Sequence, residues 1–71
     1  MFSKRIFAER FKEIRLANHL LQPQIAEILG LSKSSVSLIE KGERAVSIEV
    51  LTLLCETFNV SADYLLGLKE K

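Results

Sequence analysis

The chain has 71 residues, of which 48% are hydrophobic and 27% charged, with 10 lysines and arginines against 9 acidic residues. This length supports one domain built on a single apolar core, and the composition is that of a folded chain. Cys55 is the only cysteine, which excludes an internal disulfide and a multi-cysteine zinc site. Helix packing, with or without dimerisation, must then hold the domain together.

The apolar residues of the sequence are dispersed and form no long run. The basic start of the chain, Met1 to Glu9, has no uninterrupted apolar stretch behind its charges and does not resemble a signal peptide. No run approaches the roughly 20 residues that a membrane helix needs. We therefore expect a reduced, cytoplasmic protein.

Positive charge is concentrated in the first two-thirds of the chain, whereas Glu49, Glu56 and Asp63 offset it later, so that the net charge is only +1. A protein can present a basic face while it stays near neutral overall. Ordinary solubilising charge is the alternative explanation. The basic residues of the first two-thirds include Lys4, Arg5, Arg10, Lys12, Arg15, Lys33, Lys41 and Arg44.

The first predicted helix runs from Ser3 to about Asn18. Serine is a favoured helix N-cap, and Asn18 begins a plausible helix end, since Asn tolerates the left-handed conformation. Phe7, Phe11 and Ile14 recur at helical spacing and form the apolar stripe of this segment.

Two short helices follow, from about Gln22 to Gly30 and from Ser32 to about Lys41. Pro23 fits the first of them only because first-turn amides have no intrahelical partner. A glycine stops each helix, Gly42 being the second of these. The predicted inner positions are Ile25, Ala26, Leu29, Val36 and Ile39.

The last two predicted helices begin at serine caps, Ser47 and Ser61, and end at Asn59 and Gly67. No segment alternates as a strand would. The sequence therefore predicts an all-α fold, a compact bundle of five short helices, with one domain over 1–71 and its core at about 6–67. The predicted inner residues of the last two helices are Ile48, Leu51, Leu54, Cys55 and Phe58, then Tyr64 and Leu65.

A helix-turn-helix is predicted between Gln22 and Gly42. Ala26 is small enough for two helices to cross steeply, and Gly30 provides the positive φ that the turn needs. Val36 and Ile39 then anchor the second helix on the core, so that its other face must point outward.

These segments resemble the phage repressor/Cro-like (Xre-type) helix-turn-helix family, whose fold is the lambda repressor-like DNA-binding domain. The resemblance rests on 7–15, 22–42 and 59–67 and covers nearly the whole chain. It implies a transcriptional repressor or regulator that binds double-stranded DNA sequence-specifically, of bacterial or phage origin and associated with the nucleoid. The second helix of the pair, Ser32 to Lys41, would lie in the major groove.

The resemblance also implies which side chains meet DNA. Lys33 and Ser34 are the best candidates for contacts to base edges, with Ser37 and Leu38 on the same outward face. Three further residues, Gln22, Lys41 and Arg44, would contact the phosphate backbone, and Gln22 would also brace the recognition helix.

Arg15 and Glu40 match a family ion pair between the first and third helices. We expect both to be structural. Holding the recognition helix at its angle would be their role.

Four positions depart from the family pattern. Leu21 stands where a Ser or Thr usually caps the second helix, and Pro23 removes an amide from that helix terminus. Leu38 replaces a long polar residue and would contact a thymine methyl or join a protein interface. His19 replaces a glycine and is expected to be a turn residue.

A dimer reading a pseudo-palindromic operator is expected, because such proteins read two half-sites about 34 Å apart. Four apolar residues off the core stripe are candidates for the isologous contact, although scattered surface leucines are also ordinary. They are Val50, Leu53, Leu66 and Leu68.

A protein-interaction module on the same fold, such as an antitoxin or anti-repressor, is the alternative function. An enzyme is excluded because the sequence has one histidine, one cysteine and no paired-carboxylate or phosphate-binding motif. No cofactor, metal or small-molecule ligand is implied.

Overall fold

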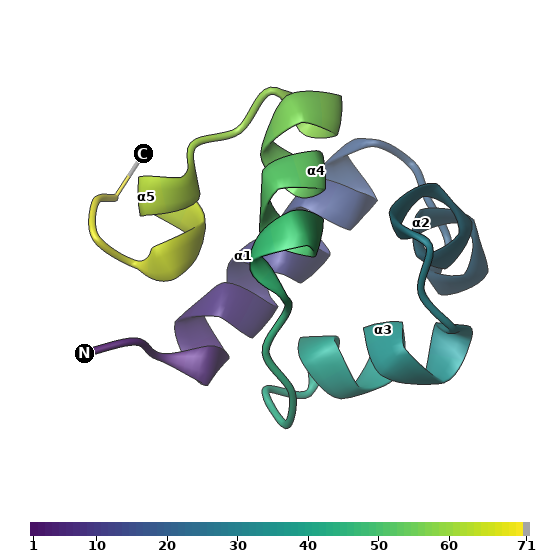
Figure 1. Ribbon diagram of the computed structural model, residues 1–71, viewed down its shortest axis with the longest axis horizontal. Helices are drawn as coiled ribbons and strands as arrows, with labels where there is room; N and C mark the ends of the chain where they lie inside the picture. The colour runs from purple at the N-terminus through teal and green to yellow at the C-terminus, as the bar shows by residue number, and fades with distance from the viewer. Residues whose placement is uncertain (71) are drawn as a thin grey trace.

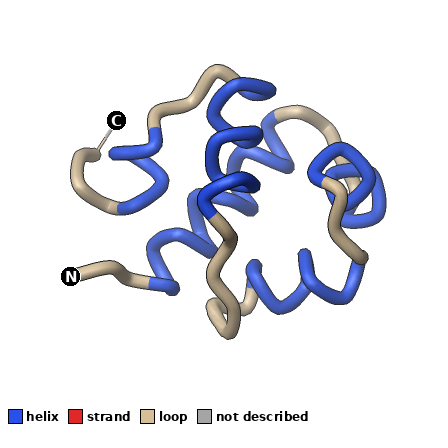
Figure 2. The backbone as a smooth tube through the Cα atoms, viewed as in Figure 1, coloured by secondary structure: helices blue, strands red, loops and turns tan. Residues whose placement is uncertain are grey.

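The computed structural model describes residues 1–70, and every regular element in that part of the chain is a helix (Figures 1 and 2). This confirms the predicted all-α bundle of five short helices. Their bounds are α1 Lys4–Ala17, α2 Gln22–Leu29, α3 Lys33–Glu40, α4 Ile48–Phe58 and α5 Ala62–Leu66.

Four of the five helices begin at a serine whose side chain accepts a hydrogen bond from a first-turn backbone N–H. These bonds satisfy donors that have no partner inside the helix. The caps are the reason why the helix starts could be predicted from the sequence. The four serines are Ser3 before α1, Ser32 before α3, Ser47 before α4 and Ser61 before α5.

The start of α2 is built differently. Leu21 occupies the N-cap position and offers no side-chain acceptor, as the sequence indicated. Gln24 reaches back from the first turn instead, and its Oε1 accepts from the Leu21 N–H at 2.7 Å. This is one half of a capping box, with the side chain supplied from inside the helix.

Residues with positive φ stop the helices. Gly30 has φ 69°, Gly42 has φ 75° and Gly67 has φ 82°, and two non-glycine residues, His19 at 57° and Asn59 at 55°, share this conformation. The prediction that His19 is a turn residue is confirmed.

The core draws side chains from all five helices. Its fully buried members are Phe7, Phe11, Ile25, Val36, Ile39, Leu54 and Leu65. In Figure 1, α4 crosses in front of α1, and α2 and α3 lie to one side of this pair while α5 lies to the other. The core therefore sits between α1 and the remaining helices.

One predicted core residue is wrong. Ile48 was expected on the inner stripe of α4, but it is 79% exposed. Its angular position does not explain this exposure, because at 3.6 residues per turn Ile48 lies only about 20° around the helix from Cys55, which packs against the core. Ile48 is instead exposed because it occupies the first position of α4, at the rim of the core.

A polar cluster docks α5 on α1. The Arg10 guanidinium lies 4.2 Å from the centroid of the Tyr64 ring and donates to the Tyr64 and Lys69 carbonyl oxygens. The Tyr64 hydroxyl donates to Glu13 Oε1, and this bond to a carboxylate raises the pKa of Tyr64, so the phenol remains a donor. Tyr64 of α5 is thus held by its ring, its hydroxyl and its carbonyl group, and the segment after α5 is held at Lys69.

The turn at Gly30 offers a clean test of backbone strain. A Cβ at Gly30 would have no heavy atom within 4 Å, so a substitution there meets only the cost of positive φ. We expect Gly30→Ala to lower the free energy of unfolding by about 1–2 kcal/mol and Gly30→Asn to lower it by less, because Asn tolerates this conformation. Urea unfolding measures both variants, and an alanine variant as stable as the parent chain would contradict the strain argument.

Candidate nucleic-acid interface

The α2–α3 pair has the geometry of a helix-turn-helix. Residues Gly30 to Ser32 form the turn, in which the Leu31 N–H donates to the Ala26 carbonyl at 2.8 Å. Ala26 itself is buried, as its small side chain predicted. The turn therefore fixes the direction in which α3 leaves α2.

The apolar side of α3 is fully covered and its polar side is not. Val36 is 0% exposed and Ile39 is 2% exposed, so these two side chains anchor the helix on the core. On the other side Lys33 and Ser34 are exposed. Figure 1 shows α3 along one edge of the molecule, which leaves its outer side free of other elements.

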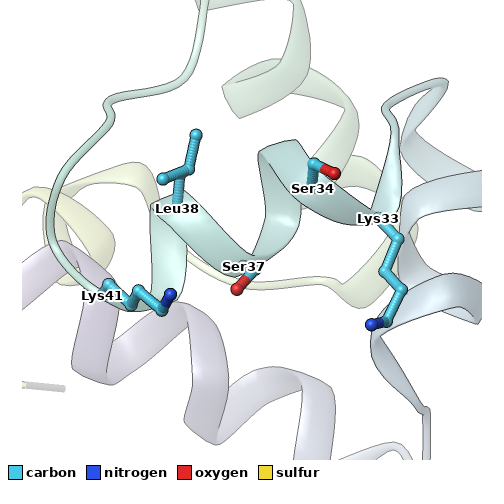
Figure 3. Close-up of a pocket in the computed structure, with 5 residues that line it drawn as sticks. All are labelled: Lys33, Ser34, Ser37, Leu38 and Lys41. Carbon is cyan, nitrogen blue, oxygen red and sulfur yellow. The ribbon is translucent and has the colours of Figure 1, made fainter.

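The outer side of α3 gathers five of the predicted DNA-binding residues. Lys33, Ser37 and Lys41 recur every four residues and form one row along the helix. Ser37 and Leu38 are half-buried within a shallow surface depression. Figure 3 shows the side chains that line it, Lys33, Ser34, Ser37, Leu38 and Lys41.

A buried polar network holds the C-terminal end of α3. Arg15 Nε donates to Glu40 Oε2 at 2.6 Å and Nη2 donates to Oε1 at 3.0 Å, a bidentate ion pair whose side chains are 9% and 5% exposed. Gln22 Nε2 also donates to Glu40 Oε1, at 3.1 Å. Arg15 Nη1 donates to the Leu20 carbonyl at 2.8 Å.

This network ties three helices and a loop to one carboxylate. Glu40 is the last residue of α3, Arg15 belongs to α1 and Gln22 is the first residue of α2. The ion pair implied by the resemblance is present, and Gln22 contacts α3 by its own hydrogen bond to Glu40. Each charge is matched and hydrogen-bonded, which a buried ion pair requires if it is to be stable.

Arg44 lies apart from the row formed by Lys33, Ser37 and Lys41. Its Nη1 donates to Ser35 Oγ at 3.0 Å. It lines a separate depression between α3 and α4 that also includes Ser47 and Val50. Arg44, which the resemblance implies as a contact to the DNA backbone, thus lies on the α4 side of α3.

Two basic residues that the sequence argument left out of the site lie beside it. The backbone of Lys4 and Arg5, in the first turn of α1, approaches Gly42, which follows α3. Some 40 residues separate these positions in the chain, so no local pattern could have indicated the contact.

Two of the four candidates for a dimer contact line adjoining hollows of the surface. Val50 lines the depression between α3 and α4, and Leu66 lines an apolar groove between the N-terminal segment, α4 and α5; Ala45, Val46 and Ser47 line both. Leu53 is 37% exposed and Leu68 is 70% exposed. The groove residues are Phe2, Phe7, Ala45, Val46, Ser47, Ile48, Leu51 and Leu66.

Two further features lie outside this interface. Burial, together with the neighbouring Glu56 carboxylate, raises the pKa of the Cys55 thiol, which favours its unreactive protonated form. Among residues 1–70, none of the helices is both long and apolar enough to pass through a bilayer.

The geometry defines a helix-turn-helix domain with an exposed second helix, and comparisons with known proteins agree. The model of the helix-turn-helix family matches residues 11–65. The control protein C.SmaI of Serratia marcescens is 38% identical over 71 residues, covering 96% of this chain and 84% of its own.

Two solved structures are also similar. The restriction-modification controller protein C.AhdI of Aeromonas hydrophila superposes with a TM-score of 0.76 and 31% identity, over 87% of this chain and 94% of that one. The P22 c2 repressor, solved in complex with a synthetic operator, gives a TM-score of 0.79 and 28% identity, over 86% and 92% of the two chains.

The chain therefore belongs to the helix-turn-helix family of the Xre/Cro-C1 type. Its function is DNA-binding transcription regulation, and the family is non-enzymatic. The resemblance, the fold and the absence of enzymatic activity expected from the sequence are confirmed on these grounds.

The Arg15–Glu40 pair should show strong energetic coupling. We expect Arg15→Leu alone to lower the free energy of unfolding by about 3–5 kcal/mol, because it leaves a buried carboxylate short of partners, and the double variant with Glu40→Leu to lose less than the sum of the two single losses. Denaturant unfolding of the parent chain, the two single variants and the double variant measures this coupling. Lys12→Leu, an exposed change on the same helix, is the control, and additive losses would show that the pair is not structural.

Proposed function

We propose that the protein reads the major groove of double-stranded DNA with α3 and represses transcription as a homodimer on a pseudo-palindromic operator. The observation that carries this proposal is the open outer side of α3, where two lysines, two serines and a leucine line one surface depression. The site of action would be the nucleoid in the cytoplasm.

Base recognition is assigned to the N-terminal part of α3, the part that contacts base edges when such a helix enters the groove. Lys33 and Ser34 are exposed there. Lysine donates to the O6 and N7 acceptors of guanine, and serine both donates and accepts. Leu38 lies one turn further and would contact a thymine methyl group.

Backbone positioning is assigned to Lys41 and Gln22. Lys41, directly after α3, offers a point charge to a phosphate. The Gln22 side-chain amide carries two N–H groups, and Glu40 takes only one of them, so the other is available to a phosphate. The same side chain would then connect the DNA backbone to the network that orients α3.

Arg44 is the third proposed phosphate contact. Its guanidinium has five N–H donors, of which one is engaged by Ser35. A phosphate on the α4 side of α3 could therefore be bound without loss of the serine bond.

Dimerisation is proposed through the groove that contains Leu66. Seven of its eight lining residues are apolar, and Ile48 within it is 79% exposed. A two-fold contact through this groove would have to place the two α3 helices about 34 Å apart, one turn of DNA. The lining of the groove includes Leu66 but not Val50, Leu53 or Leu68, so only Leu66 among the four candidates belongs to this proposed contact.

The antitoxin or anti-repressor alternative has less support. The relatives that this chain matches along most of their length are control proteins and a repressor. A salt titration of binding to random DNA separates the two functions, because a DNA binder loses affinity steeply as salt rises and an interaction module does not.

Substitution of the two lysines should separate base reading from backbone binding. We expect Lys33→Ala to relax preference at one base pair at a cost of about 1–3 kcal/mol, and Lys41→Ala to weaken all sequences alike. Selection of bound sites from a random DNA pool, repeated with each variant, measures both effects. Equal and uniform losses from the two variants would contradict the assigned roles.

The proposed dimer face predicts different effects on dimerisation for serine substitutions at two exposed aliphatic residues of α4. We expect sedimentation to show a dimer for the parent chain and Ile48→Ser to shift it towards monomer, while Leu53→Ser, on the other flank of α4, leaves it dimeric. Both side chains are solvent-accessible, at 79% and 37%, so neither change should unfold the domain. A parent chain that stays monomeric at high concentration would exclude a preformed dimer.

A further inference from the structure

A second cluster of positive charge adjoins the C-terminal end of the recognition helix. A methyl group placed on Gly42 would lie 3.7 Å from the Arg5 Cα and 3.7 Å from the Lys4 carbonyl oxygen. The first turn of α1 therefore abuts the turn that directly follows Lys41. We name the surface formed by Lys4, Arg5 and Lys41 the α1–α3 basic patch.

The charges of this patch face solvent and are not neutralised by ion pairs. All three residues are exposed, and the single ion pair found within residues 1–70 is the one between Arg15 and Glu40. Glu43 is also close in the chain, but it comes within ion-pair distance of none of them. The patch is thus available to an external anion.

Two of these charges occupy positions that the helix itself disfavours. Lys4 and Arg5 are the first two residues of α1, whose first turn contains no acidic residue. The N-terminal end of a helix carries a partial positive charge, so cations there lower helix stability. Local folding energetics therefore give no reason for this pair of cations, whereas binding of an anion would.

We propose that Lys4 and Arg5 bind the phosphate backbone of DNA beside the recognition helix, extending the duplex contact from α3 onto the start of α1. The inference rests on the proposed function, because it requires the outer side of α3 to face the duplex. Its partner is the DNA backbone, since Lys4 and Arg5 are complementary to phosphate in charge and their backbone adjoins Gly42, the residue after Lys41 on that face. The contact would strengthen binding to every sequence without reading bases.

The test is a salt titration of binding to a short random-sequence duplex by the full chain and three single variants. We expect Lys4→Ala and Arg5→Ala each to reduce the slope of log K against log salt by about 1. Lys69→Ala is the matched control, because it also removes one exposed positive charge, beyond α5, where α1 and not α3 is the neighbouring helix. It should leave the slope unchanged.

Thermal unfolding of the same variants separates binding from folding. Lys4→Ala and Arg5→Ala should unfold at or above the temperature of the parent chain, because each removes a cation from the positive end of α1. Variants that lose slope and also unfold at a lower temperature would assign the residues a structural role and overturn the inference.

The outcomes for the inference and for the proposed function differ. A parent chain that binds with a steep slope, together with variants indistinguishable from Lys69→Ala, overturns the patch while DNA binding by α3 stands. A parent chain with no salt-dependent binding to any duplex overturns the proposed function itself.

Discussion

The carboxylate of Glu40 is the point on which the arrangement of the helices depends. It receives two hydrogen bonds from Arg15 and one from Gln22, so that a single side chain at the end of α3 fixes the relation of three helices. Because the group is only 5% exposed, water cannot replace these donors without opening the structure. The direction of α3 is therefore set by charge pairing as well as by apolar packing, and a helix of 8 residues gains a rigidity that its own length would not provide.

Apolar packing alone would not leave α3 usable. Val36 and Ile39 attach one side of α3 to the core and are the only buried residues of this helix. The polar residues on its outer side therefore remain accessible. A wider apolar stripe would hold the helix more firmly but would cover the side chains proposed to read bases. The polar network at one end of α3 and the serine cap at the other supply the missing constraint without using that outer surface.

Local chemistry made most of the fold predictable. Serine caps and residues of positive φ act within a few positions, so the five helices could be bounded from the sequence, and the resemblance located the ion pair. The errors and omissions involve contacts that depend on the whole bundle. Ile48 obeys helical spacing but lies at the exposed start of α4, and Arg5 approaches Gly42 because the first turn of α1 abuts the turn after α3. The individual DNA contacts stay predictions.

The docking of α5 on α1 has a consequence for the order in which the molecule opens. The bond from Arg10 to the Tyr64 carbonyl joins residues 54 positions apart, whereas α2 and α3 meet across a short turn. Closing a long segment of chain costs more entropy than closing a short one, and α5 has only 5 residues with which to offset that cost. We therefore expect the contact between α1 and α5 to form late in folding. In the folded protein, the amide hydrogens of α5 should exchange faster than those of the α2–α3 pair, because the α1–α5 contact opens while that pair stays folded.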